Sequence, residues 1–332
     1  MKKTRLTGCE EGLSSFEEGN FSIVCPPSPA GSTDSEETMR VPCSPFRTVG
    51  EADKPGAEAK PSLLSPPAVE WERTNKIAGM PKASHRKRAF VAGFDDYSTK
   101  PLRAAVKDAT DVHAALLRLG FESTLHTDLW FEEFNAAVRK FLASLQPGDV
   151  TFVYFAGHGV EAATRLGGYE ITSNWWLAKS VPEMNDDLPR MAIDATTFLE
   201  QIEAKGPAFN IMVSDCCRDN PLPTYVDFVG KPISKMLPKR SLVAYACEPG
   251  QLAAERRGAG HNGYYAEQLL KHLETPELRV EDLFREVRQG VNEMTKHFSC
   301  GMQDPRVEDA LRVKNATLAC PAGVGVKRDR DG

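Results

Sequence analysis

The stretch Val150-Thr151-Phe152-Val153-Tyr154-Phe155-Ala156 is followed directly by Gly157-His158-Gly159. A short run that is almost wholly apolar and ends at glycine is typical of a strand buried on both faces. Comparable runs occupy residues 88–93, 209–214 and 241–246, and the more polar residues 121–126 also read as a strand. We therefore predict that these five runs are strands of one sheet.

Between the strands, apolar residues recur at the spacing of an amphipathic helix. The predicted helices cover residues 105–119, 131–145, 195–204, 264–273 and 280–297. Alternating strands and helices indicate an α/β fold, with a mostly parallel sheet and helices on both faces. Ligands bind such sheets beyond the carboxyl ends of the strands, so the residues that follow each run are candidate site residues.

A histidine and a cysteine occupy such positions. His158 follows one strand, and Cys217 follows another about 60 residues later. A thiolate is a nucleophile, and a nearby imidazole can stabilise it and transfer protons. Asp215 and Cys217 share one face of an extended strand, whereas Cys216 points to the other. The two positions therefore indicate a Cys–His catalytic pair, and the N–H of Gly159 is a candidate for an oxyanion hole.

Each residue also has a structural interpretation. A histidine between glycines is often a turn or packing residue, and cysteine is among the most buried residue types. Metal binding is a further alternative, but the spacing of the candidate ligands matches no zinc pattern. These ligands would be Cys216, Cys217, Cys247 and Cys300.

Composition excludes several classes of protein. The chain has 332 residues, of which 41% are hydrophobic, and a net charge of −5. An acidic balance argues against nucleic-acid binding, and no apolar run reaches the roughly 20 residues of a membrane span. The 8 cysteines are too sparse for a disulfide scaffold, so we expect a reduced, cytoplasmic protein.

The chain is also unevenly organised. Residues 1–86 contain clusters of proline and serine without a helical or strand period, and we predict that this segment is disordered. Residues 87–313 carry the alternating strands and helices and form the predicted domain. Residues 314–332 read as a polar C-terminal tail.

Two motifs resemble those of a known group. Residues 154–161 (YFAGHGVE) and 214–218 (SDCCR) are similar to the catalytic motifs of the caspase, metacaspase and paracaspase superfamily of cysteine peptidases. Residues 102–109, 244–246 and Gln303-Asp304-Pro305 match the superfamily in the same order. The pattern is most similar to paracaspases or metacaspases, and the resemblance implies a caspase-like fold over about 87–313.

The resemblance also implies residue roles. His158 would be the general base and acid, and Cys217 the nucleophile that forms an acyl-enzyme. Asp108 and Asp215 match the carboxylates of the S1 pocket, which implies cleavage of proteins or peptides after a basic P1 residue, Arg or Lys. Glu248 and Glu255 are further candidates for this pocket.

Regulation leaves several alternatives open. Lys235, Lys239 and Arg240 lie where relatives have an intersubunit linker, so they are candidate autocleavage sites, or part of an uncleaved loop. The acidic residues in 161–190 would attract activating calcium or simply be solvated, and we expect no required cofactor or metal. A homodimer and a monomer both fit. The alternative function is a caspase-like interaction or scaffold module with little turnover, regulated by the N-terminal segment.

Overall fold

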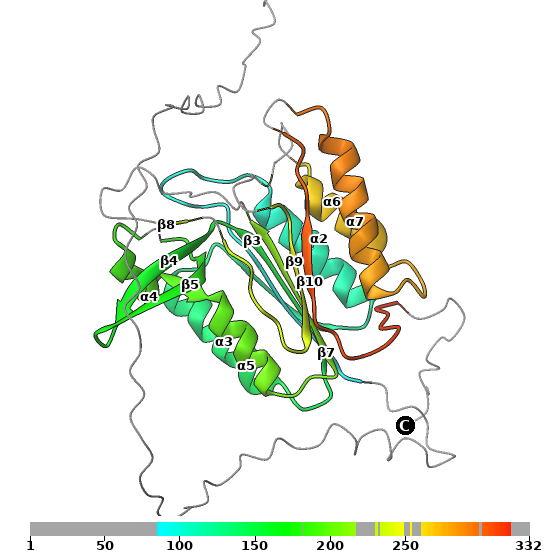
Figure 1. Cartoon of the computed structure of the whole chain (residues 1–332), viewed down its shortest axis with the longest axis horizontal. Coiled ribbons are helices and arrows are strands. Elements are labelled where there is room, and N and C mark those ends of the chain that lie inside the picture. Colours follow the sequence, from blue (N-terminus) through cyan, green and yellow to red (C-terminus); the bar gives the residue numbers. More distant parts are fainter. Residues whose placement is uncertain are drawn as a thin grey trace, which may run out of the picture. The chain divides into compact units, whose positions relative to one another are not determined.

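The computed structural model describes residues 85–180, 182–216, 230–231, 233–248, 253, 260–298 and 301–319. Within them a six-stranded sheet has the order β10-β9-β7-β3-β1-β2, and only β10 is antiparallel to its neighbour (Figure 1). The strands are β1 (Lys87–Gly93), β2 (Glu122–Thr127), β3 (Val150–Gly157), β7 (Phe209–Cys216), β9 (Ser241–Tyr245) and β10 (Arg306–Asp309). The predicted mostly parallel sheet is confirmed.

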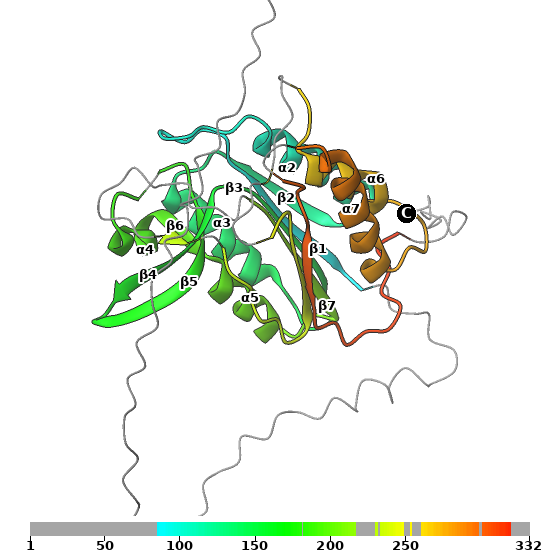
Figure 2. The ribbon, with the colours of Figure 1, turned by 45° about the horizontal axis from the view of Figure 1, so that its top comes forward.

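Helices cover both faces of this sheet, as the alternating pattern predicted (Figure 2). One face carries α2 (Ala105–Arg118), α6 (Tyr264–Leu273) and α7 (Val280–Thr295). The other carries α3 (Phe131–Ser144) and α5 (Ala195–Ala204). Each helix buries residues at intervals of three or four, such as Leu283, Val287 and Val291 of α7, because that spacing gathers apolar side chains on one side.

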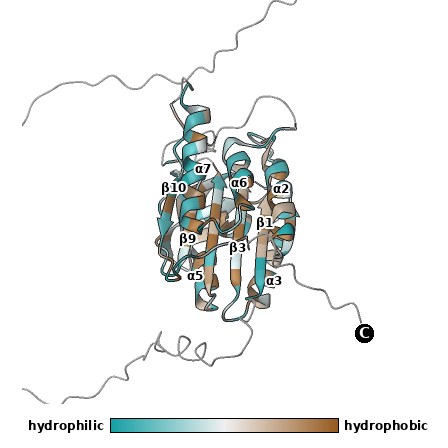
Figure 3. Cartoon of the chain, turned by 90° about the vertical axis from the view of Figure 1, so that its right-hand side faces the viewer, coloured by the Kyte–Doolittle hydropathy of each residue, from teal (hydrophilic) through white to brown (hydrophobic). Residues whose placement is uncertain are grey.

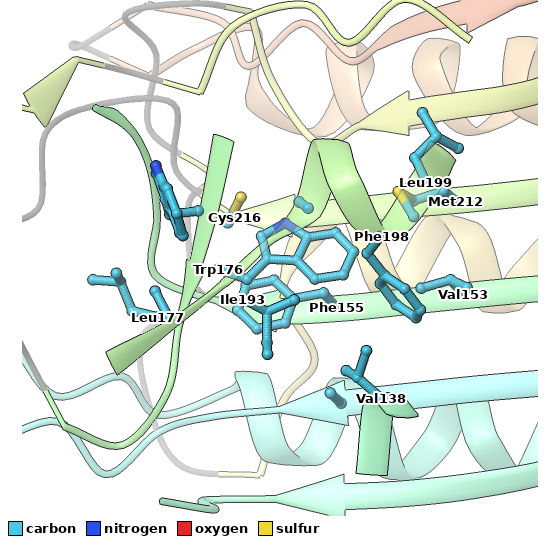
Figure 4. Packing of buried hydrophobic residues seen from close by; sticks show 14 of the residues in the cluster. Val138, Val153, Phe155, Trp176, Leu177, Ile193, Phe198, Leu199, Met212 and Cys216 are labelled. Atoms are coloured by element: carbon cyan, nitrogen blue, oxygen red, sulfur yellow. The ribbon is translucent and has the colours of Figure 1, made fainter. Parts of the chain in front are cut away.

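The core forms two layers because successive side chains of a strand point to opposite faces. All eight residues of β3 are buried. Phe155 stacks on Trp176, with ring centroids 4.6 Å apart, in the layer shown in Figure 4. Tyr154 lies in the other layer, beneath α2 and α6. Figure 3 shows apolar segments along the central strands β3 and β1.

A smaller antiparallel sheet lies at one end of the large one (Figures 1 and 2). It contains β4 (Gly159–Leu166), β5 (Tyr169–Leu177), β6 (Ala192–Asp194) and β8 (Gly230–Lys231), in the order β6-β5-β4-β8. The short helices η1 (Asn185–Asp187) and α4 (Leu188–Met191) follow β5. Gly167 and Gly168 both have positive φ, which a two-residue hairpin turn of type I′ requires. The hairpin of β4 and β5 therefore begins directly after His158.

The C-terminal boundary differs from the prediction. We expected a polar tail from residue 314, but Ala316 and Leu318 are buried against the α7 side of the sheet. The carbonyl of Ala316 accepts from Val280 N at 2.8 Å, and that of Leu318 accepts from Lys87 Nζ at 2.8 Å. Ala316 and Leu318 therefore anchor a stretch of chain that is otherwise mostly polar. The packed chain thus continues to residue 319, whereas residues 1–84 and 320–332 lie outside the described residues.

Candidate active site

The ends of two neighbouring strands define the site. β3 and β7 are parallel, and Gly157 at the end of β3 pairs with Cys216 at the end of β7. His158 and Cys217 are the next residues of these two segments. Cys217 itself lies outside the described residues, so its predicted role stays a prediction. The structure confirms that the strands preceding the two residues are adjacent.

His158 is held by a backbone carbonyl. The side chain is buried, and its Nε2 lies 2.7 Å from the carbonyl oxygen of Lys100. Because a carbonyl oxygen only accepts, this contact places the imidazole proton on Nε2, and Nδ1 is then the basic nitrogen of the neutral ring. Lys100 has a φ of 53°, a conformation that is costly for a residue with a Cβ. A strained loop residue thus orients the histidine, and no sequence pattern indicated it.

Tyr97 was also missed by the sequence analysis. Its hydroxyl accepts from His158 N at 3.0 Å and donates to the carbonyl of Leu177 at 3.1 Å, so it takes the place of a direct ladder bond between two strands. Its ring centroid lies 4.4 Å from that of His158. A Cβ at Gly157 would lie 2.6 Å from the Tyr97 hydroxyl, which explains glycine before the histidine.

Burial raises the pKa of Tyr97 far above its usual value, even though its hydrogen bond with the backbone of His158 acts in the opposite direction. The hydroxyl therefore stays protonated and keeps its ability to donate to Leu177. The neutral Tyr97 side chain therefore bridges the backbone of His158 and that of Leu177.

Cys216 and Asp215 lie toward opposite faces of β7, as the strand period predicts for neighbouring residues. Cys216 is buried in the core layer that includes Trp176, whereas Asp215 points to the opposite layer. A Cβ at Gly159 would lie 2.8 Å from Cys216 Sγ and 2.3 Å from Ile233 Cδ1. Glycine is therefore required by packing at position 159, in addition to its predicted role in an oxyanion hole.

The structure brings the two predicted S1 carboxylates to one cleft. Asp108 comes from the first turn of α2 and Asp215 from the end of β7, and both line it. Tyr154 Oη donates to Asp215 Oδ2 at 2.6 Å. Burial, and then the charge of Asp215, hold the pKa of Tyr154 well above its usual value, so its hydroxyl remains a donor.

Asp108 has a structural task as well. It accepts from Gly263 N at 3.0 Å and from Asn262 Nδ2 at 2.9 Å, which ties α2 to the start of α6. These contacts satisfy a carboxyl group that is 4% exposed. The charge of Asp108 is thus stabilised by donors from a distant segment that sequence reasoning did not connect with it.

The remaining walls of the cleft include Leu102, Ala156, Tyr265 and Gln303. Gln303 belongs to the late motif of the resemblance, and its Nε2 donates to the carbonyl of Ala246 at 2.9 Å. The free space in this cleft is small, about 30 Å³.

The other candidate pocket acids are placed differently. Glu248 Oε1 accepts from Arg306 Nε at 2.5 Å and does not line the cleft that holds Asp108 and Asp215. Glu255 lies outside the described residues. Among the described residues, the carboxylates that line the pocket are those of Asp108 and Asp215.

The candidate autocleavage residues lie in a segment with many contacts. Lys235 Nζ lies 2.5 Å from Glu308 Oε2 of β10. The backbone N–H groups of Lys239 and Arg240 both donate to Glu203 Oε1 at 2.9 Å. Cleavage at these positions would require those contacts to break first.

Acidic side chains of residues 161–190 serve as local hydrogen-bond acceptors. Asp186 Oδ1 accepts from Arg165 N at 3.0 Å, and Asp187 Oδ2 accepts from Met184 N at 3.1 Å. Across the described ranges, no three His, Cys, Asp or Glu side chains gather in a way that would hold a metal ion. Cys217 and Cys300 fall outside those ranges. None of the helices described here has the length and hydropathy to cross a bilayer.

The model of the caspase domain family matches residues 86–316, which include both motifs and both strand ends. The chain belongs to the caspase domain family. The resemblance seen in the two motifs is thereby confirmed at the level of the superfamily. No curated protein matches the chain.

Two solved structures are similar to this chain at low sequence identity. A protein from Geobacter sulfurreducens, GSU0716, has a TM-score of 0.50 and 17% identity, over 70% of this chain and 96% of that one. Caspase-1 from Spodoptera frugiperda has a TM-score of 0.48 and 16% identity, over 71% of this chain and 89% of that one. At these identities the similarity extends to the fold alone.

Proposed function

We propose that the chain is a cysteine endopeptidase in which Cys217 and His158 form the catalytic pair. The Cys217 thiolate attacks the peptide carbonyl carbon, and a C–S bond replaces the C–N bond as His158 gives a proton to the leaving amine. Water, deprotonated by His158, then hydrolyses the thioester and restores the thiol. The N–H of Gly159 stabilises the charge on the carbonyl oxygen.

One observation carries this proposal. Gly157 and Cys216 are register partners on adjacent parallel strands, and the residues that follow them in the chain are His158 and Cys217. From the β1–α2 loop, the Tyr97 hydroxyl binds the backbone N–H of His158, and the carbonyl of Lys100 binds the imidazole. A histidine with one nitrogen bound to an orienting group has the arrangement of a general base.

The proposed substrates carry arginine or lysine at P1. Asp108 and Asp215 line one cleft beside Ala156 and Gly157, directly before the catalytic histidine. Asp108 is 4% exposed and Asp215 is partly buried. Two negative charges in such a place favour binding of a cation, because buried charge needs compensation. We infer a specificity like that of paracaspases or metacaspases.

Fluorogenic peptides with P1 Arg, Lys or Asp test the proposal on the full chain. We expect turnover after Arg or Lys, its loss in Cys217→Ala and His158→Ala, and its retention in Cys216→Ala, the matched control on the opposite face. Retained turnover in Cys217→Ala would refute the assignment of Cys217 as the nucleophile. Cleavage only after Asp would refute the assignment of the S1 pocket.

The proposal extends to regulation. We infer that a reducing compartment such as the cytoplasm keeps Cys217 reduced, and that turnover does not require calcium, because the described acidic side chains of residues 161–190 accept local hydrogen bonds. Activity in calcium and in chelator tests the second point, and loss of turnover in chelator refutes it. Incubated wild type and Cys217→Ala protein, compared by mass, test cleavage after Lys235, Lys239 or Arg240. Identical masses refute autocleavage, and sedimentation of the same samples reports any homodimer.

A further inference from the structure

Tyr265 lies in the wall of the S1 cleft and is not used by the proposed mechanism. It stands in the first turn of α6, and its side chain is 2% exposed. Within the described part of the chain, its hydroxyl has no hydrogen-bond partner. A buried hydroxyl without a partner is costly, and such groups in folded proteins call for an explanation.

The surroundings of this hydroxyl suggest what it binds. Tyr265 lines the same cleft as Asp108 and Asp215, together with Gly263 and Tyr264 of the α6 start. The hydroxyl of the other buried tyrosine of this layer, Tyr154, is already bound to Asp215. The two aspartates have donors from the protein, whereas the Tyr265 hydroxyl has no partner among the described residues and is left to interact with a ligand.

We propose that the Tyr265 hydroxyl is a hydrogen-bonding group of the S1 pocket that selects arginine over lysine at P1. This inference rests on the proposed peptidase function. In this arrangement, the Tyr265 hydroxyl oxygen accepts a hydrogen bond from one N–H of the P1 guanidinium, whose other N–H groups contact Asp108 and Asp215.

The chemistry of the two cations separates them at such a site. A guanidinium has five N–H donors in a rigid plane, so it can reach two carboxylates and a third acceptor at once. An ammonium has three donors around one nitrogen on a flexible stem, and two carboxylates already occupy most of them. Burial, and then the charge of Asp215, keep the pKa of Tyr265 well above its usual value, so the oxygen is present as a neutral hydroxyl.

Two acetylated tetrapeptide amides that differ only in a final Arg or Lys provide the binding probe. Titration calorimetry on the full-length Cys217→Ala chain measures both without turnover. We expect the Arg peptide to bind about 10-fold more tightly than the Lys peptide, in line with one hydrogen bond to a charged group. Adding Tyr265→Phe should remove most of this preference by weakening the Arg peptide alone. Tyr169→Phe, an exposed tyrosine on β5, is the matched control and should change neither affinity.

The Tyr265→Phe change deletes one oxygen that has no partner in the described residues, so the variant should fold with an unchanged or higher melting temperature. An unchanged Arg preference in Tyr265→Phe overturns the assignment, and if P1-Arg substrates are still cleaved the peptidase proposal stands. A Tyr265-dependent preference in a chain with no turnover supports the assignment and overturns the peptidase. Failure of both binding and turnover overturns both.

Discussion

Tyr97→Phe tests whether one hydroxyl holds the backbone of the catalytic histidine. The substitution keeps the ring, whose centroid lies 4.4 Å from that of His158, and removes only the oxygen. The N–H of His158 then loses its acceptor and the carbonyl of Leu177 loses a donor. No other change to this part of the site is so small.

The magnitude follows from burial. A buried backbone group that loses its partner costs about 1–3 kcal/mol, so two such groups should lower the free energy of unfolding by about 3 kcal/mol. In a domain of this size, 1 kcal/mol shifts the melting temperature by about 2–4 °C, which gives a fall of about 6–12 °C. If His158 acts as proposed, kcat should also fall while KM changes little.

Thermal and urea unfolding of the full chain measure the first effect, with the exposed Tyr169→Phe as control. A shift no larger than that of the control would refute the structural role of the Tyr97 hydroxyl. Stability that falls while kcat stays at the wild-type value would separate the two claims. It would mean that the hydroxyl supports the fold without positioning the imidazole.

Three further predictions rest on single contacts. Gly157→Ala places a Cβ 2.6 Å from a tyrosine hydroxyl, so it should lower the melting temperature, and wild-type stability would contradict the packing argument. Tyr154→Phe removes the donor to Asp215 and should cost about 1.5–3 kcal/mol in urea unfolding while weakening binding of P1-Arg peptides; unchanged values of both would rule out the contact. Burial opposes ionisation of Asp304, but the hydrogen bond and charge of Arg288 outweigh it and lower the pKa of Asp304. Its stabilisation is therefore complete above about pH 4 and is lost as the pH falls through the lowered pKa. Arg288→Gln should reduce both neutral-pH stability and the loss of stability below about pH 4, and an unchanged acid slope would count against the ion pair.

Much of the fold could be predicted because local patterns carry it. Continuous apolar runs such as 150–156 exclude an exposed strand, and the helical spacing of residues such as Leu283 and Val287 fits burial on one side only. The burial of residues after 314 could not be predicted, because no local pattern indicates it. Ala316 and Leu318 are two apolar residues in a polar stretch, and only contact with the α7 side shows that they are buried.

The sequence by itself determined the strand ends and the residue types that stand there, because strand period and glycine placement are local properties. It therefore indicated His158, Asp215 and the opposite orientation of Cys216. Only the tertiary structure decided what surrounds them: the Tyr97 bridge, the carbonyl of Lys100 and the orphan hydroxyl of Tyr265. These groups come from loops and helices between 58 and 107 residues away from His158 in the chain, and nothing in a local pattern records which segments fold against each other.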